Sequence, residues 1–285
     1  MCKRPFFLRS IALVVLASAT RPLGAQVDAT LMARVAWTEG PAVGQLADVA
    51  QVEVPEVCRF TDAQGAKQFL EATHEVWSGR ELGGLLCRIA PNGDDAWFVL
   101  FTYNAIGLVR DDEKTSLDPR KLLAGLRRTN DSVNDLRRRQ GGDGADIVGW
   151  GQRPVYDSVA HSLTWSTRLR DQGPGGAEAV SHAVRLLGRD GDMNIDFAIE
   201  AAKDDAVSEL SERILRGFSF LPGHRYADWR AGDPVSDRGL TTLIVGSSGR
   251  ISQSARIVVA FGAAALVGFL IWLIWSMRKE SQQRS

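Results

Sequence analysis

Three residues that could do acid–base chemistry lie close together in the sequence: Tyr156, Asp157 and His161, in the stretch YDSVAH. Histidine is the side chain best suited to act as a general base near neutral pH, and a neighbouring carboxylate can hold its ring in one tautomer. These residues are therefore the catalytic candidates of a hydrolase interpretation. Such a site also requires a nucleophile or a metal, and the sequence contains neither a GxSxG motif nor a zinc-binding histidine pair.

The alternation of side chains around His161 favours a structural role over a catalytic one. His161 is in phase with Trp165 and other apolar residues, which places it on the apolar face of a strand that follows a tight turn. In the expected antiparallel register, His182 lies near Trp165 and His161 lies near Leu186. Both histidines are then core residues. Asp157, at the turn, could accept a hydrogen bond from His161 for structural reasons alone.

The elements that must position these residues follow from hydrophobic periodicity. Strand-like patterns cover residues 48–55, 82–89, 96–103, 161–169, 180–186 and 193–199. Helical spacing predicts helices over residues 62–73, 118–139 and 207–215, the second of them opened by an Asp-Pro pair. The last three strands have short connections and form an antiparallel meander. We therefore predict an α+β fold, an antiparallel sheet with packed helices, in one domain over residues 26–230.

Composition, charge and residue spacing argue against nucleic-acid, metal and cofactor binding. Lys+Arg and Asp+Glu both number 34, so the formal net charge is zero and no nucleic-acid partner is expected. The arginines of the helix over 118–139 fit a solvated face, with contact to lipid phosphate as the alternative. The remaining histidines and cysteines do not have the spacing of metal ligands, so no metal and no cofactor is expected.

The two ends of the chain predict export and membrane anchoring. Residues 1–25 have a basic start, a short apolar core and a small residue, Ala25, at a cleavage point, as in a signal peptide. An uncleaved signal anchor is the alternative. Ile257 to Met277 carry no charge and are long enough to cross a bilayer as a helix. We expect a single span in the bacterial inner membrane, with residues 278–285 in the cytoplasm and the domain on the periplasmic side.

Two features of the exported part are left open by the sequence alone. Cys58 and Cys87 could form a disulfide in an oxidising compartment, or could be small buried apolar residues. Residues 231–256 link the domain to the span. They are read either as a juxtamembrane helix that ends at the GSSG stretch or as a flexible stalk.

Several long segments together resemble a known family. They are WTEGP, ADVAQVEVPEVCRF, WFVLFTYNAIGLVRDDE, LDPRKLLAGLRRTNDSVNDLRRRQG, GWGQRPVYDSVAHSLTWS, VRLLGRDGDMNI and GHRYADWRAGDPVSDRGLTTLIVG. In these the chain is similar to the bacterial membrane-anchored family catalogued as domain of unknown function 2167. The resemblance implies a signal peptide, an exported domain and a C-terminal span, and it implies no activity. Leu108 and the pair Asp237-Arg238 depart from the family pattern. Residues 150–220 also resemble, loosely, the sandwich of PsbP-like proteins, a likeness of architecture alone.

These observations lead to one expected function and two alternatives. We expect a non-enzymatic envelope protein whose exported domain acts as an interaction or scaffolding module. Its partners would be the lipid bilayer, through Ile257 to Met277, and an envelope protein that the sequence does not identify. The alternatives are an exported hydrolase that uses His161, Asp157 and Tyr156, and a binder of lipid or a small ligand.

Overall fold

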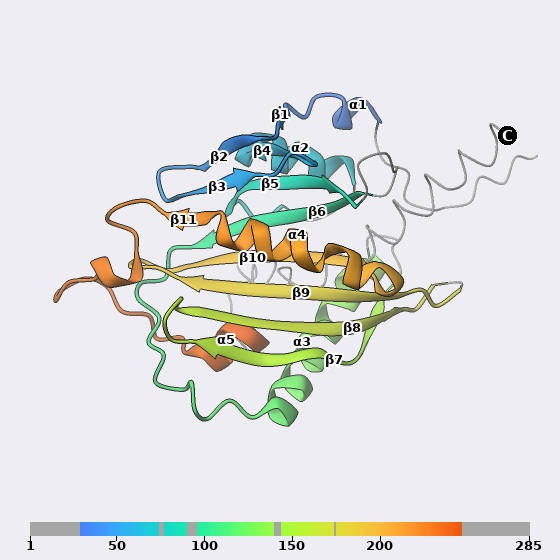
Figure 1. Cartoon of the computed structure of the whole chain (residues 1–285). Helices are drawn as coiled ribbons and strands as arrows, with labels where there is room; N and C mark the ends of the chain where they lie inside the picture. The colour runs from blue at the N-terminus through green and yellow to red at the C-terminus, as the bar shows by residue number, and fades with distance from the viewer. Residues whose placement is uncertain (1–28, 74–76, 90–95, 140–143, 174, 247–285) are drawn as a thin grey trace, which may run out of the picture.

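A computed structural model of the chain describes residues 29–73, 77–89, 96–139, 144–173 and 175–246 (Figure 1). The strands are β1 (Thr38–Glu39), β2 (Ala42–Leu46), β3 (Ala50–Val54), β4 (Cys58–Asp62), β5 (Glu81–Arg88), β6 (Ala96–Asn104), β7 (Ala145–Asp157), β8 (Ser162–Asp171), β9 (Glu178–Leu187), β10 (Asp192–Glu200) and β11 (Phe218–Phe220). The helices are α1 (Ala29–Met32), α2 (Ala63–Ala72), α3 (Pro119–Arg139), α4 (Asp204–Arg216) and α5 (Leu240–Val245), with short 3-10 turns η1 (Ala201–Lys203) and η2 (Tyr226–Asp228).

Two antiparallel sheets form the centre of the protein. The larger has eight strands in the order β1-β4-β5-β6-β10-β9-β8-β7, and the smaller has three in the order β11-β3-β2. Strands β8, β9 and β10 are neighbours in both sequence and space, which confirms the predicted meander. The predicted α+β class, an antiparallel sheet with packed helices, is also confirmed.

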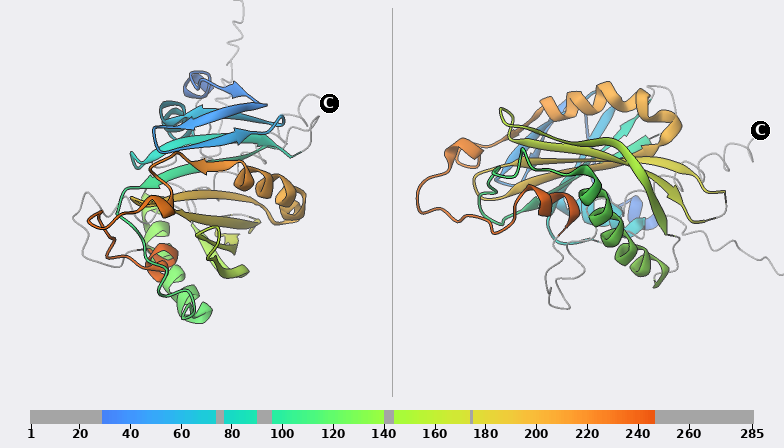
Figure 2. Two further views of the ribbon diagram at one scale, coloured as in Figure 1. Left: turned by 60° about the vertical axis from the view of Figure 1, so that its left-hand side comes forward. Right: turned by 90° about the horizontal axis from the view of Figure 1, so that it is seen from below.

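The helices lie on opposite sides of the large sheet. Helix α4 covers one face, and α3 and α5 cover the other face beside β7 and β8 (Figure 2). The small sheet lies on the α4 side, because Gly44 of β2 packs against the ring of Phe60, whose side chain shares a face with Val99 of β6 and Phe197 of β10. Helix α2 lies on the opposite side, where Phe69 stacks on Phe98 with ring centroids 4.0 Å apart.

A first apolar core fills the α4 side. Met193, Ile195 and Ile199 point to this side from β10, and each has an exposed fraction of 0%. They pack in one cluster with Val207 and Ile214 of α4 and with apolar residues of the small sheet. Alternation along β10 therefore produces a fully apolar face, as the period of two in its sequence predicts.

A second apolar core lies between the meander and the helices α3 and α5. Its buried residues are Val109, Leu122, Leu126, Leu163, Trp165, Ala183, Leu187, Leu240 and Ile244. Helix α3 begins as predicted, with Asp118 accepting hydrogen bonds from the main-chain nitrogens of Arg120 and Lys121. This core ties the end of the described chain to the meander, because α5 contributes Leu240 and Ile244 to it.

Residues 223–246, which we call the C-terminal strap, run along the domain rather than away from it. Arg189 holds the strap through a two-pronged ion pair with Asp233, at 2.8 and 2.9 Å. Leu108 and Val235 form a parallel bridge, and the hydroxyl of Thr129 on α3 donates to the carbonyl of Val245 at 2.6 Å. A short helix, α5, lies directly before GSSG, and its residues Leu240 and Ile244 are buried against the domain.

Two expectations about the hairpin around Asp157 are wrong. His161 is not the first residue of the strand, since it belongs to the turn over residues 158–161 and β8 begins at Ser162. The register also differs by one residue from the expected one, because His182 lies opposite Ser166, and Ala183 lies opposite Trp165. A shift of one residue moves a side chain to the other face of a sheet. His182 therefore points to the α4 side, away from Trp165.

The two predicted membrane-targeting segments fall outside the described residues: the signal peptide, residues 1–25, and the span, residues 257–277. Within the ranges that the structure describes, no helix is both long enough and apolar enough to cross a membrane.

Candidate functional site

The carboxylate of Asp157 is used by the β7–β8 turn. Its Oδ1 accepts hydrogen bonds from the main-chain nitrogens of Val159 and Ala160, at 2.7 and 3.1 Å. These two bonds are the main reason why the pKa of Asp157 is lowered; the charge of His161 is the smallest contribution. His161 closes the turn with a φ of 47°, in the left-handed region. Asp157 thus builds the turn and is not bonded to the imidazole.

His161 instead contacts two tyrosines. The Tyr156 hydroxyl lies 3.4 Å from His161 Nδ1, and the imidazole stacks on the ring of Tyr226 with centroids 4.0 Å apart. Tyr226 comes from the C-terminal strap, and its hydroxyl donates to the carbonyl of Val109 at 3.3 Å. The Tyr156 hydroxyl is also hydrogen-bonded to Asp111. His161 is half-buried, at the edge of the second core.

The electrostatics of this cluster keep its phenols protonated. Burial, followed by the charge of Asp111, raises the pKa of Tyr156 far above its usual value. Burial also raises the pKa of Tyr226, again with help from Asp111. The pKa of Asp111 is lowered, chiefly by its hydrogen bond with Lys114. A phenol that stays protonated at neutral pH is a poor nucleophile and a poor proton acceptor, so Tyr156 acts here as a hydrogen-bond donor.

The structure thus brings together two of the three predicted residues and adds two that sequence reasoning missed. Tyr156 and His161 are in contact, Asp157 is not part of their hydrogen bonding, and Asp111 and Tyr226 complete the cluster. Asp111 belongs to the acidic run VRDDEK and Tyr226 to the segment GHRYADW. Both lie far from His161 in the sequence, so no local pattern indicated that they contact it. Among the described contacts of His161, no serine, threonine or cysteine side chain serves as a nucleophile.

A second group of polar residues lies on the face of the large sheet opposite α4. We call it the polar strip, and it consists of Asn104, Arg185, Asp192, Asn194 and Asp196. Arg185 donates to Asp196 at 2.8 Å and lies over the ring of Trp165, 4.9 Å from its centroid. Asn104 donates to Asp192 at 3.0 Å and accepts a hydrogen bond from Arg80. Three chain segments, β6, β9 and β10, therefore meet through side chains that are charged or amide-bearing.

The two carboxyl groups of the polar strip are almost completely buried. Asp192 and Asp196 have exposed fractions of 0% and 1%. One oxygen of each carboxyl, Oδ1 of Asp192 and Oδ2 of Asp196, has no hydrogen-bond partner in the described part of the chain. Burial raises the pKa of Asp196 to about 6 against the opposing charge of Arg185, and burial also raises the pKa of Asp192. An unpartnered buried oxygen is a place where a proton can reside.

His182 has a structural environment on the opposite side of the sheet. Its Nε2 lies 2.6 Å from Oδ1 of Asp204, the first residue of α4, and its ring stacks on Phe197 with centroids 4.7 Å apart. The pair fixes the start of α4 against β9. His74, by contrast, lies outside the described residues.

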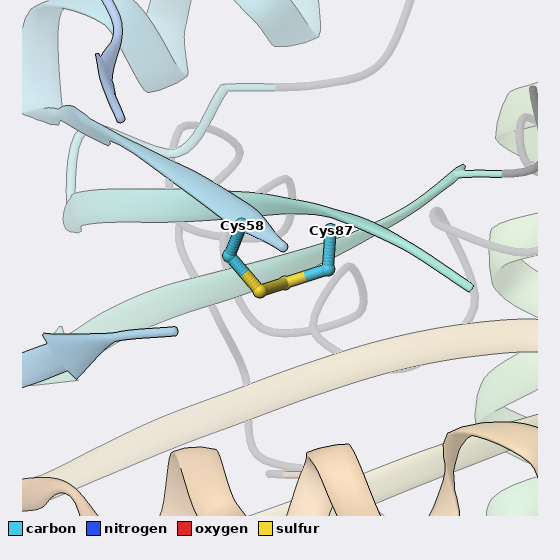
Figure 3. Close-up of a disulfide and its surroundings, with 2 residues drawn as sticks. All are labelled: Cys58 and Cys87. Atoms are coloured by element: carbon cyan, nitrogen blue, oxygen red, sulfur yellow. A yellow bond between two sulfur atoms is a disulfide. The ribbon is translucent and has the colours of Figure 1, made fainter. Parts of the chain in front are cut away.

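Cys58 and Cys87 are joined by a disulfide that links β4 to β5 (Figure 3). The two residues are directly opposite each other in the strand register, and both are buried. The bond lies on the α4 side, since Cys87 is also opposite Trp97, whose ring packs edge-on against Phe197. It therefore braces the first core. In the ranges that the structure describes, no three metal-ligating side chains of His, Cys, Asp or Glu gather at one point.

Comparisons with known proteins identify the family. The family model described as "Protein of unknown function (DUF2167)" matches residues 38–278, and the chain belongs to that family. No match was found among curated proteins.

Two solved structures are similar at a low level. The solution structure of cyanobacterial PsbP (CyanoP) from Synechocystis sp. PCC 6803 has a TM-score of 0.37 at 11% identity, covering 65% of this chain and 92% of that one. The Saccharomyces cerevisiae Ran-binding protein Mog1p has a TM-score of 0.34 at 14% identity, covering 68% of this chain and 100% of that one. Similarity at these TM-scores carries no argument about function.

Proposed function

We propose that this chain is a membrane-tethered interaction module that holds a folded domain close to the periplasmic side of the bacterial inner membrane and catalyses no reaction. The observation that carries the proposal is the C-terminal strap. It is the last described part of the chain before the apolar residues Ile257 to Met277, and it is bound to the domain by an ion pair, a strand bridge and a buried helix.

The strap limits how far the domain can stand from its anchor. The chain leaves the described domain at Gly246, and residues 246–256 separate it from the apolar segment. Even a fully extended chain rises only about 3.5 Å per residue, so this connection reaches no more than about 40 Å. A short connection to a domain with a fixed exit point suits a module that must meet partners at the membrane surface.

The geometry around His161 supports a role without catalysis. Asp157 is engaged by turn amides, and the raised pKa of Tyr156 leaves its hydroxyl protonated. The imidazole is fixed by stacking on Tyr226 of the strap. These contacts hold the β7–β8 hairpin against the strap, so they support a structural role for the cluster.

The same junction offers a surface for a protein partner. Val159, at the tip of the hairpin, is 91% exposed, and Val155 on β7 and Val235 on the strap are 52% and 39% exposed. An apolar side chain as exposed as Val159, at the tip of a hairpin, is available for contact with a partner. We infer that this end of the domain contacts an envelope protein.

Site-specific crosslinking in intact cells tests this function. A photo-crosslinking amino acid at position 159 of the full chain should give one discrete protein adduct, and a Val155→Asp substitution in the same chain should reduce it. The matched control is the same amino acid at Val43, which is 54% exposed on β2 of the small sheet. Equal adducts at both positions, or none at position 159 in correctly inserted protein, would contradict the proposal.

A further inference from the structure

The first half of α3 carries a cluster of cations on its exposed side. Arg120, Lys121, Arg127 and Arg128 are all exposed, and no acidic residue occurs in the helix before Asp131. At 100° per residue the four side chains fall within one arc of the helix surface. We call these four residues the basic half of α3.

The local structure of the helix does not account for these charges. A helix N-terminus carries a partial positive charge, so it favours acidic residues in its first turn. The first turn of α3 contains none and instead carries Arg120 and Lys121 directly after Pro119. The nearby carboxylate of Asp118 is already bonded to the main-chain nitrogens of both residues. Arg120 and Lys121 therefore lie where the helix dipole disfavours positive charge.

Only one of the four side chains has a clear structural partner. Arg127 donates to the carbonyls of Ile147 and Val148 on the edge strand β7, at 3.0 and 2.8 Å. Within the described part of the chain, Arg120, Lys121 and Arg128 make no ion pair. By contrast, Arg138, near the other end of α3, is paired with Asp135 at 2.7 Å. Among the α3 side chains that the structure describes, the three arginine and lysine residues without an ion pair or a hydrogen-bond partner, Arg120, Lys121 and Arg128, therefore all lie in the first half of the helix.

The chain leaves the domain next to this cluster. The hydroxyl of Thr129 binds the carbonyl of Val245, and a Cβ added to Gly125 would lie 2.7 Å from a methyl group of Val245. The last described residue, Gly246, therefore follows a residue that is packed on the middle of α3. Figure 2 shows α3 and α5 together on the side of the sheet opposite α4.

We propose that the basic half of α3 is a docking surface for the anionic headgroups of phospholipids in the membrane that anchors the chain. The inference rests on the proposed function, since residues 246–256 can bring this surface to the headgroups only if residues 257–277 span the bilayer. Charge complementarity supplies the attraction: clustered lysines and arginines beside a membrane span bind anionic lipid, and their field extends about 8–10 Å at physiological salt. The docked helix then fixes which side of the domain faces the membrane.

Fluorescence quenching in lipid nanodiscs tests the docking. The full-length chain, with a fluorescent amino acid in place of Ala124 on the exposed side of α3, is reconstituted in discs that contain a spin-labelled headgroup lipid. One set of discs is otherwise phosphatidylcholine, and the other includes phosphatidylglycerol. We expect at least twofold stronger quenching in the anionic discs, reversed by high salt. The same label at Val43 should show no dependence on lipid charge.

Charge reversal supplies the matched control. Arg120→Glu, Lys121→Glu and Arg128→Glu together should abolish the lipid-dependent quenching at position 124. A second triple variant, Arg88→Glu, Arg153→Glu and Arg213→Glu, has the same change of net charge at exposed positions on β5, β7 and α4, and it should behave as the unmodified chain. Circular dichroism checks that both variants are folded.

The possible results separate this inference from the function on which it rests. A chain that inserts in the discs but is quenched equally in both lipids overturns the docking and leaves the tether intact. Equal loss in both triple variants also overturns it, since the attraction would then follow net charge and not this surface. A chain that does not insert overturns the anchor and the docking together.

Discussion

Strand β10 separates two interiors of different chemistry. On one face Ile195 and its apolar neighbours are sealed by α4, the small sheet and the disulfide, and on the other face Asp192 and Asp196 are equally buried among arginines and asparagines. Removal from water stabilises the apolar face directly. On the polar face the same removal costs free energy, which ion pairing offsets only where the geometry is good. Burial alone therefore does not define the role of a face.

The largest expected effect is on the apolar face. Phe197→Ala removes a ring that packs against Trp97 and stacks on His182, with centroids 4.8 and 4.7 Å away. We expect it to lower the free energy of unfolding by about 3–5 kcal/mol. Urea denaturation followed by tryptophan fluorescence measures this. A loss below about 1 kcal/mol would mean that this face is loosely packed.

A nearly equal effect is expected on the polar face, with a different dependence on pH. Arg185→Met leaves the Asp196 carboxylate buried without its partner and should cost about 3–4 kcal/mol at pH 7.5. The cost should shrink at pH 5, where Asp196 becomes protonated. The double variant Arg185→Met with Asp196→Leu should recover most of the loss in the same denaturation assay. A double variant as unstable as the single one would show that the polar strip stabilises the fold by more than charge balance.

Removal of the disulfide should have a somewhat smaller effect. Replacing both Cys58 and Cys87 by Ala frees β4 from β5 in the unfolded chain and leaves two small gaps in the first core. We expect a loss of about 2–4 kcal/mol. Thermal unfolding of the oxidised, the reduced and the Ala-substituted chain measures it. Stability unchanged in all three would contradict a bracing role on this face.

The pH dependence of stability distinguishes the two faces most specifically. The folded state raises the pKa of Asp196 from 3.8 to about 6, so it binds the proton more tightly than the unfolded chain does. This contribution is complete below about pH 4 and is lost as pH rises towards 6. Lowering the pH from 7 to 5 should therefore raise the free energy of unfolding by about 1–2 kcal/mol from this group.

Asp196→Asn is the control for that slope, since it retains an oxygen that can accept from Arg185 and removes the titrating group. Because the amide mimics the protonated carboxyl, the variant should be at least as stable as the unmodified chain at pH 7, and it should lack the gain between pH 7 and pH 5. A slope identical to that of the unmodified chain would place the titrating group elsewhere.

The smallest expected effect on stability lies outside both interiors. Val159→Asp changes a side chain that is 91% exposed at the hairpin tip, and the unfolding free energy should shift by less than about 0.5 kcal/mol. Yield of the partner complex from intact cells should nevertheless fall. Unchanged yield would remove the hairpin tip from the proposed interaction surface.

Features that depend on neighbouring residues in the sequence, such as strands and their two faces, were predicted correctly. The alternation of Met193, Ile195 and Phe197 with Asn194 and Asp196 predicted a strand with two unlike faces, because the period of two is a local property. It did not indicate that the polar face would be buried, since this depends on Arg185 and on elements far away in the chain. The family resemblance was equally readable, because it rests on long contiguous segments.

The candidate site was less predictable for the same reason. Pairing between β8 and β9 differs by one residue from the expected register, and this difference alone moves His182 from Trp165 to Asp204. Asp111 and Tyr226 reach His161 through loops whose paths no periodicity specifies. The carboxylate of Asp157 accepts hydrogen bonds from two main-chain amides of the turn, as Asp often does in turns, and not from the imidazole that a catalytic pair would require.

The most direct test of the central claim, a domain anchored outside the cytoplasm, is the location of the chain on either side of residues 257–277. A reporter that is active only in the cytoplasm is fused after Ser285, and in a second chain a reporter that is active only after export replaces residues 247–285, directly after the strap. The account predicts signal from both fusions in membrane-inserted or exported protein. A silent C-terminal reporter in correctly inserted chain, or a silent exported reporter, would contradict it.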